Sequence, residues 1–423
     1  MMKRAFCGIG AVLSLLVATA VPATAGGLYL YELSASDVGL GSAGWTARAH
    51  DASTLFKNPA GMVRIDDGDL LINVQGLYLD IQFSPDPATT TSGPDGDASG
   101  FLPTPGIYYV LGISDDIKFG IGMAGYFGLA ASYEDDWVGR YYVQNTQLQA
   151  VSIQPTAAFR LGAGWSLGVG IAAQYGILDT EIAINNVAPG ATDGQLSLDD
   201  TAWGYQGNLG VLWEGKKGCR VGLQYLSAAK LDFSATPDFT NLAPALQTAL
   251  AARGLLDARL DLGMKMPRAV RVGWAGVPTA NWGVFADLGW EDWSQFGKVD
   301  VGITSTTDTS LTTDLQYDDV WHVAAGARRQ FGDAWGLNFG FAYDSSMVDD
   351  ANRTPTLPVG PATRFGIGGE WSYGKGEVAF GYELIWSGDL PVNVERGPLA
   401  GRVSGSYDGM AVHAFAASWR KIF

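Results

Sequence analysis

The sequence is poor in cysteine, in basic residues and in metal-ligand patterns. Only Cys7 and Cys219 are present, and Cys7 falls in an N-terminal leader, so the mature chain could form neither an internal disulfide nor a thiolate metal cluster. The net charge of −16 at pH 7 argues against nucleic-acid binding, which needs a basic face to neutralise phosphates. His50, His322 and His413 are scattered without metal-ligand spacing. We therefore expect no metal, no cofactor and no nucleic-acid partner.

Residues 1–25 have the pattern of a cleaved signal peptide. Lys3 and Arg4 form a positive n-region, residues 9–21 are almost wholly apolar, and the small residues at 23–25 form a cleavage site. The apolar run is shorter than the ~20 residues that a membrane-spanning helix requires. We predict that this segment is removed and that the mature chain leaves the cytoplasm.

Glycine and aromatic residues are abundant, whereas charged residues are few. The chain has 57 Gly, 14 Trp, 17 Tyr and 18 Phe, and only 17% of its residues are charged. After the leader, no apolar run is long enough for a transmembrane helix. This combination is typical of a transmembrane β-barrel. A secreted β-sandwich or propeller is the soluble alternative, but the sequence has no fixed-period repeat of the propeller type.

Several segments alternate between large apolar residues and small or polar ones. In one of them Trp335, Leu337, Phe339, Phe341 and Tyr343 share a face. Similar alternation covers residues 165–177, 203–214 and 377–386. A period of two places each set on one face of a strand. Apolar faces that begin and end with Trp or Tyr indicate lipid-facing strands with aromatic girdles.

Short polar turns and long loops take turns along the chain. About six short turns and seven long loops give about fourteen strands, an even number with both termini on the short-turn side. We therefore predict an all-β protein, in which residues 62–423 form a transmembrane antiparallel β-barrel in a bacterial outer membrane. Residues 26–61 do not alternate, and we interpret them as a small N-terminal hatch that plugs the lumen.

The predicted external loops carry pairs of acidic residues. These are Asp135-Asp136, Asp199-Asp200, Asp318-Asp319 and Asp349-Asp350. A solvated rim is the ordinary interpretation, and divalent-cation bridging to the anionic headgroups of outer-membrane lipid and lipopolysaccharide is the alternative. Another loop is apolar, with leucines at helical spacing. Its residues are Phe239, Leu242, Leu246, Leu250, Leu255 and Leu256. Such a stripe either packs on its own rim or binds hydrophobic molecules.

Two Gly-x-Gly-x-x-Gly patterns begin at Gly39 and Gly120, but neither lies in a βαβ unit, so dinucleotide binding is not expected. Gly120, Gly122, Gly125 and Gly128 are instead predicted to weaken and bend one barrel strand, the third along the chain.

Enzyme signatures are also missing. The sequence has no Gly-x-Ser-x-Gly or His-Glu-x-x-His motif, and no Ser, His and acid set stands out, so we do not expect an enzyme. Asp287 and Glu291 share the inward face of one strand. Two inward carboxylates could serve acid–base chemistry, but we expect them to pair with barrel arginines such as Arg271 or Arg328.

Three blocks of the sequence resemble the FadL-type outer-membrane transporters for long-chain fatty acids and other hydrophobic compounds. They are residues 32–60, which end in Asn58-Pro59-Ala60, residues 293–296 (Trp-Ser-Gln-Phe) and residues 335–365. Each block is weak alone, and their order and spacing carry the resemblance.

The resemblance implies a fourteen-stranded barrel with a hatch that works as a passive, monomeric transporter. The stripe at 239–256 would capture the ligand, the hatch with its Asn-Pro-Ala motif would gate an inner site, and the kinked third strand would release the ligand sideways into the outer leaflet. Lys298 and Arg364 are the candidate contacts for a ligand carboxylate. Two alternatives stay open, namely uptake of aromatic or alkane hydrocarbons and a structural or adhesive barrel.

Overall fold

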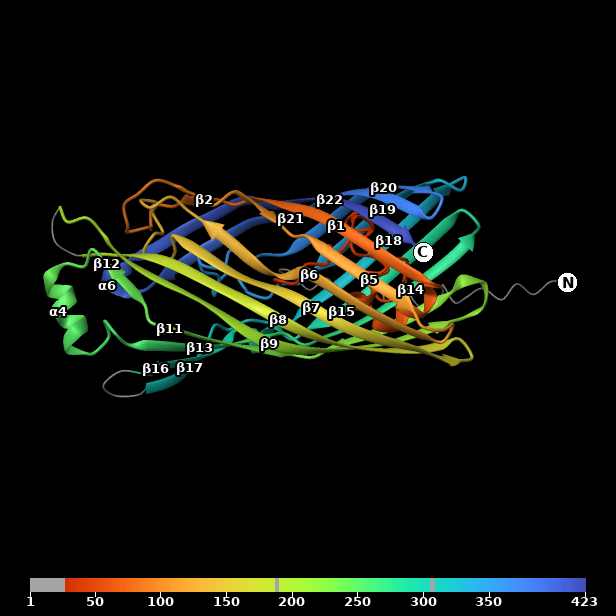
Figure 1. Ribbon diagram of the computed structural model, residues 1–423. Coiled ribbons are helices and arrows are strands. Elements are labelled where there is room, and N and C mark those ends of the chain that lie inside the picture. The colour runs from red at the N-terminus through yellow and green to blue at the C-terminus, as the bar shows by residue number, and fades with distance from the viewer. Residues whose placement is uncertain (1–26, 187–189, 305–308) are drawn as a thin grey trace.

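The computed structural model describes residues 27–186, 190–304 and 309–423, so the predicted signal peptide lies outside the described chain. The described residues form a closed antiparallel barrel of 14 strands, which confirms the predicted all-β fold. Figure 1 shows a long barrel of tilted strands with the N-terminal segment, coloured red, near the end that carries the C-terminus. None of the helices in this part of the chain has both the length and the apolar character needed to cross a bilayer.

Interruptions divide several of the barrel strands into shorter segments. The first half of the barrel contains β1 (Gly68–Asp80), β2 (Gln82–Pro85), β3 (Gly96–Asp97), β4 (Gly100–Pro103), β5 (Gly106–Gly112), β6 (Ile117–Ser132), β7 (Asn145–Gly162), β8 (Trp165–Ile184) and β9 (Gly194–Glu214). The second half contains β10 (Arg220–Leu226), β11 (Ala229–Ala235), β12 (Asp238–Thr240), β13 (Arg259–Met266), β14 (Ala269–Thr279), β15 (Trp282–Glu291), β16 (Lys298–Thr304), β17 (Thr309–Asp314), β18 (Val320–Phe331), β19 (Trp335–Asp344), β20 (Ala362–Tyr373), β21 (Gly376–Glu395) and β22 (Arg402–Ile422). The barrel closes where β1 pairs with β22, from Asp69 opposite Ile422 to Asp80 opposite Ala411.

The barrel wall has its large apolar side chains outside and its polar side chains inside. In β19, Trp335 is 58% exposed, whereas Asn338 on the opposite face is 1% exposed. The same inversion occurs in β8, where Ile171 is 61% exposed and Gln174 is fully buried. A soluble sandwich would bury the large residues instead. The predicted lipid-facing alternation is therefore confirmed by the burial pattern.

Long connections gather at one end of the barrel and short turns at the other. The long end carries β12, β16, β17 and the helices α4 (Pro244–Ala252) and α6 (Gly397–Ala400), as Figure 1 shows. The short 3₁₀ turn η2 (Lys216–Gly218) lies between β9 and β10, at the opposite end. Short turns on the periplasmic side and long loops outside are the pattern of outer-membrane barrels.

Residues 27–65, which we call the hatch, lie inside the barrel wall and are almost completely buried. They form α2 (Ala35–Gly39), α3 (Thr54–Lys57) and the 3₁₀ helix η1 (Pro59–Arg64). Helix α2 packs on β19 to β22, and η1 packs on β6 to β9. Because η1 continues beyond the predicted boundary at residue 61, the first barrel strand begins only at Gly68.

Glycines on the inner wall allow the hatch backbone to approach the strands closely. A Cβ at Gly340 would overlap the carbonyl oxygen of Leu40, and one at Gly366 would overlap that of Val38. A Cβ at Gly222 would overlap the carbonyl oxygen of Thr46. The wall therefore contacts the hatch through backbone atoms, which only glycine permits at these sites.

Candidate functional site

The third barrel strand, β6, separates from the second strand in its outer half. Its pairing with β5 ends where Gly106 lies opposite Ala124. Beyond that point the register with β7 shifts between Gly125 and Phe127, which marks a β-bulge. Gly128 has a φ of +150°, a backbone conformation that favours glycine.

The start of the hatch takes the place of a barrel neighbour at this bulge. The amide of Leu30 donates to the Tyr126 carbonyl at 2.8 Å, and the amide of Gly128 donates to the Leu28 carbonyl at 3.0 Å. Because backbone groups inside a membrane barrel must be paired, residues 28–30 satisfy an edge that β4 and β5 do not cover. The bend lies at Gly125 to Gly128, whereas Gly120 and Gly122 lie in the regularly paired part of β6.

An apolar cavity of about 270 Å³ lies beside this part of β6. The hatch contributes one wall through Leu28, and the strands and the α5 turn (Trp293–Phe296) contribute others. The main apolar lining residues are Leu28, Leu129, Leu148, Leu178, Met264 and Phe296. One cation, Arg396, also lines the cavity. The cavity can bury a hydrophobic group and offers a guanidinium at its edge.

Phe296 of the cavity lining belongs to a cluster of packed aromatic rings. Phe127 stacks on Trp293 with ring centroids 6.0 Å apart, and Phe296 meets Trp293 edge-on at 5.2 Å. Tyr29 of the hatch contacts Phe127 edge-on at 5.5 Å. The block Trp293 to Phe296, which was singled out in the sequence, therefore joins the hatch to the bent strand. Its contribution to a site was not evident from sequence spacing.

Buried ion pairs and hydrogen bonds join the hatch to the barrel wall. The Arg364 guanidinium pairs with Glu32 of the hatch and lies 2.6 Å from Asp344. Asp287 accepts hydrogen bonds from the backbone amides of Gly44, Trp45 and Thr46. Breaking such buried partnerships leaves uncompensated charge in the interior, which is costly.

Glu291 has the partner that we expected, whereas Asp287 has a different one. Glu291 pairs with Arg271 at 2.5 Å and accepts a hydrogen bond from Tyr31 of the hatch at 2.6 Å. Asp287 caps hatch backbone amides instead of pairing with an arginine. The sequence could not show this, because backbone amides carry no residue signature.

Comparison with known proteins gives the family. A model of the family described as "Outer membrane protein transport protein (OMPP1/FadL/TodX)" matches residues 15–423, nearly the whole chain. The chain belongs to this family. Its place in the outer membrane follows from this membership and from the closed barrel.

Individual relatives are similar over most of their length. The long-chain fatty acid transport protein of Salmonella typhi is 26% identical over 415 residues, which cover 91% of this chain and 93% of that protein. A Pseudomonas aeruginosa FadL homologue has a TM-score of 0.83 at 19% identity, covering 94% of this chain and 100% of that one. The Pseudomonas putida toluene transporter TodX has a TM-score of 0.69 at 16% identity, covering 94% and 99% of the two chains. The two solved structures support the barrel fold.

The two cations predicted for a ligand carboxylate lie in different places in this FadL-family barrel. Arg364 is buried among Glu32, Asp344 and Glu383, so its charge is already neutralised within the protein. Lys298 opens β16, is half-buried and lies two residues after Phe296 of the cavity lining. The geometry therefore gives Arg364 a part in attaching the hatch and leaves its ligand role an untested prediction.

Arg396, which the sequence analysis did not select, is the cation on the cavity wall. Its guanidinium lies 4.8 Å from the ring centroid of Tyr142. Among the residues that the structure describes, no carboxylate lies within 4.0 Å of it, whereas its neighbour Arg402 pairs with Glu395 at 2.6 Å. A single arginine just after a long strand belongs to no sequence motif, so the sequence could not identify Arg396 as a cavity residue.

The Asn58-Pro59-Ala60 motif anchors the hatch to the strands across the lumen. The Asn58 amide donates to the Thr46 carbonyl at 2.7 Å and to the Val211 carbonyl at 3.0 Å. Its side-chain oxygen caps η1 by accepting from the Ala60 amide at 3.1 Å. Pro59 occupies the first turn of η1, where a missing amide hydrogen costs nothing. A gating role for this motif stays a prediction.

Only part of the apolar loop is helical, because α4 contains Leu246 and Leu250 but not the other residues of the stripe. The groove beside it is mixed in character. Phe239, Leu242 and Leu256 line a groove of about 590 Å³ together with polar residues such as Asp238 and Asp257. The remaining three predicted residues, Leu246, Leu250 and Leu255, do not line that groove and are half-buried. Their role in ligand capture stays a prediction.

A serine, a histidine and an aspartate form a chain that the sequence analysis missed. Ser42 Oγ lies 3.0 Å from His322 Nε2, and His322 Nδ1 lies 2.5 Å from Asp344 Oδ1. This order resembles that of a hydrolase triad. All three residues are only 1% exposed, and none of them lines a described cavity. The chain therefore joins the hatch to the wall without access for a substrate.

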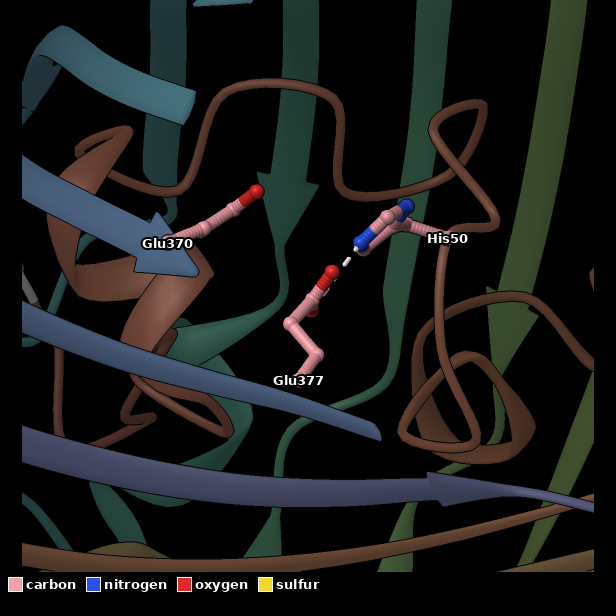
Figure 2. Close-up of side chains that lie close together, drawn as sticks. All are labelled: His50, Glu370 and Glu377. Carbon is pink, nitrogen blue, oxygen red and sulfur yellow. Dashed lines mark hydrogen bonds and ion pairs between the residues drawn. The ribbon is translucent and has the colours of Figure 1, made fainter. Parts of the chain in front are cut away.

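The side chains of His50, Glu370 and Glu377 lie close together, as Figure 2 shows. His50 Nε2 lies 3.3 Å from Glu377 Oε1, which is a spacing that a metal ion could use. However, the guanidinium groups of Arg328 and Arg420 both lie 3.4 Å from the same ring nitrogen. Two cations at that distance would repel a metal ion, so we interpret this group as an ion-pair network.

Proposed function

We propose that the protein is a passive transporter for long-chain fatty acids or similar hydrophobic molecules in the outer membrane, acting as a monomer. The observation that supports this most directly is the apolar cavity between the hatch, the bent strand β6 and the outer loops, with Arg396 at its edge. Burial of each methylene contributes about 0.8 kcal/mol. An acyl chain therefore gains from this cavity, while its carboxylate gains from Arg396.

The proposed path runs from the outer loops to the cavity and then sideways. The loop stripe with Phe239, Leu242 and Leu256 would collect apolar molecules at the rim. Because β6 leaves β5 after Ala124, the wall beside the cavity is held by hatch residues 28–30 instead of by a barrel strand. Movement of those residues would enlarge the cavity and open a route into the outer leaflet.

Hydrocarbon uptake is the second candidate, and the size of the cavity favours it. A cavity of about 150 Å³ can already hold benzene, so about 270 Å³ is enough for a one-ring aromatic. The same volume lies below the roughly 300 Å³ at which ordinary ligand pockets begin. A long acyl chain would therefore need the hatch segment at Leu28 to move, whereas toluene would not.

A catalytic role and a purely structural role have less support. The Ser42, His322 and Asp344 chain is buried away from the cavity, so we propose no enzymatic activity. A structural or adhesive barrel would need no apolar cavity with a single cation. The family name and the relatives both point to transport.

The deciding experiment is equilibrium binding to the detergent-folded protein with oleate, a long alkane and toluene. Arg396→Gln is the test variant, and Arg402→Gln is the matched control because that arginine does not line the cavity and is already paired with Glu395. Lys298→Gln tests separately whether Lys298, the other candidate cation, contributes to oleate binding.

If the ligand is a fatty acid, Arg396→Gln weakens oleate binding about tenfold or more, as expected for a charge-assisted hydrogen bond, and leaves toluene binding unchanged. Equal binding of all three compounds, with no effect of Arg396→Gln, would move the substrate to hydrocarbons. Absence of binding by any apolar compound would refute the transport proposal.

A further inference from the structure

A second, basic pocket lies at the end of the barrel that carries the short turns. Its volume is about 350 Å³, and it is distinct from the apolar cavity in all of its lining residues. Four arginines and a histidine line it, namely Arg48, Arg64, Arg220, Arg328 and His50. Ala280 and Asn281, in the short turn between β14 and β15, also line it, so the pocket is at the periplasmic mouth.

No carboxylate lines this pocket, although carboxylates lie behind three of its arginines. Arg48 pairs with Asp37 and Arg328 with Glu370, at 2.5 Å and 2.6 Å respectively. Arg64 pairs with Glu214. These acids are not among the lining residues, so the pocket itself presents guanidinium groups.

Arg220 is the exception among the four. It is 8% exposed, and within the described residues no carboxylate lies within 4.0 Å of its guanidinium. Its Nε donates to the Ala47 carbonyl at 2.8 Å, and its Nη2 donates to the Arg48 carbonyl at 3.2 Å. No hydrogen bond to a described protein group is made by its Nη1. A buried cation without a directly paired carboxylate is costly, and an anion in the pocket would offset that cost.

The chemistry of the lining selects the kind of ligand. A guanidinium presents N–H donors in a planar fork that matches carboxylate and phosphate oxygens. Val277, Trp282 and Phe285 complete the lining with apolar surface, so part of the ligand can be hydrocarbon. The arginines face the pocket and would repel a metal ion, whereas the carboxylates that could attract one are not among the lining residues.

We propose that this arginine pocket is an anion-binding site that takes a carboxylate or phosphate group from the periplasmic side. Two sources carry that chemistry, a free small anion of the periplasm and the head group of a fatty acid. The site is separate from the outer cavity, so the proposal does not depend on which hydrophobic compound the cavity takes.

The test is calorimetric titration of the full-length, detergent-folded protein at low salt with inorganic phosphate, octanoate and octanol. Arg220→Gln and Arg64→Gln are the test variants, and Arg64 is an exposed side chain whose loss the barrel should tolerate. Arg160→Gln is the matched control. Arg160 lies at the same end, with its Nη1 4.0 Å from Glu214, but it does not line the pocket.

We expect an anion to bind the wild-type protein and the Arg160→Gln control equally, and to bind both test variants at least tenfold more weakly. Binding of phosphate as well as octanoate identifies a general anion site. Binding of octanoate without phosphate, weakened by both test variants, identifies a fatty-acid head group, whereas any binding of octanol should be the same in all variants. If no anion binds, or if the test variants bind octanoate as tightly as the wild-type protein, the proposal is wrong. Equal weakening by Arg160→Gln would also refute it.

A variant that does not fold is recognised by the loss of its heat-modifiable mobility on a gel, which reports the barrel. If Arg220→Gln fails in this way, Arg64→Gln alone decides the outcome. Binding of toluene at the outer cavity is measured on the same samples. It separates a failure of the arginine pocket from a failure of the transport proposal.

Discussion

The two halves of the lumen are filled in different ways. In the half nearest the short turns, the hatch backbone lies directly on inward glycines such as Gly340 and Gly366, and buried charges complete the contact. In the half nearest the long loops, side chains from several strands meet around a cavity of about 270 Å³. Backbone on glycine leaves no free volume at these contacts, and the free volume of this half lies in the arginine pocket of about 350 Å³ at the periplasmic mouth. In the other half, branched side chains on a curved wall leave the apolar cavity.

This difference separates attachment from binding. The glycine contacts fix the position of the hatch, because neither backbone can yield without moving a strand. The apolar cavity can change shape through rotation of side chains and through movement of residues 28–30. We therefore expect substitutions at the glycine and ion-pair contacts of the hatch to change hatch docking, and substitutions in the lining of the apolar cavity to change the affinity for apolar ligands. Four predictions test this separation.

The largest effect is expected for Gly366→Ala. Its new Cβ would overlap the Val38 carbonyl oxygen and approach the Gly41 amide nitrogen to 2.6 Å, and both are backbone atoms. Overpacking of this kind costs about 1–3 kcal/mol, and we expect about 3 kcal/mol because no side chain can yield. Hydrogen exchange of hatch amides should speed up while the barrel stays folded. Gly369→Ala, in the same strand, is the control because its nearest atom would be 3.9 Å away.

A somewhat smaller effect is expected for Asp287→Asn. The aspartate accepts hydrogen bonds from three hatch amides through both of its side-chain oxygens, whereas an asparagine of the same size offers only one acceptor oxygen. We expect a loss of about 2 kcal/mol in hatch docking, from the cost of leaving a buried donor without a partner. The measurement is exchange of the Gly44 to Thr46 amides. Asp300→Asn, an exposed acid of β16, should change nothing, and an equal effect there would contradict the argument.

Filling the apolar cavity should change ligand affinity and leave hatch docking unchanged. Leu148→Trp places a larger side chain in the cavity lining, and we expect affinity for toluene or oleate to fall about tenfold, or about 1.4 kcal/mol. Hatch exchange should stay at the wild-type rate. Leu167→Trp adds the same side chain on the lipid-facing side, where Leu167 is 42% exposed, and should leave binding intact. If Leu148→Trp changed the hydrogen exchange of the hatch amides and left ligand binding unchanged, the proposed division between attachment and binding would be wrong.

The smallest effect concerns pH. Burial raises the pKa of Asp51 in the hatch, but the adjacent Lys57 and Arg48 cations outweigh burial and hold that pKa below its usual range. A lowered folded-state pKa means that Asp51 stabilises docking above its unfolded pKa of about 3.9, and that this stabilisation is lost as the pH falls through the folded value.

Hatch exchange, corrected for its intrinsic pH dependence, should therefore be constant from about pH 7 to pH 5 and rise only below about pH 4. Asp51→Asn should remove this acid-dependent part. Release of the hatch already near pH 6, with the Asp51→Asn variant behaving like wild type, would show that another group controls docking.

The sequence predicted the barrel better than the site. Alternation such as that from Trp335 to Tyr343 is local, and its two faces in β19 differ as expected. The residues that pair with the hatch were harder to predict. Glu32 and Arg364 are 332 residues apart, and each has many possible partners in the sequence. Arg364 was predicted to bind a ligand because the sequence does not show that three carboxylates lie beside it. Arg396 was not selected because the sequence does not show the cavity that it lines.

The sequence by itself determined that strands would form, how they would face lipid, and that a glycine-rich N-terminal segment would not supply one of the long alternating strands. These properties follow from a residue period of two and from the need to pair every backbone group inside a membrane. Only the tertiary structure decided which arginines face a cavity and which are neutralised. Barrel closure brings distant strands within a few ångströms, and electrostatic interaction depends on that separation and on the burial it creates.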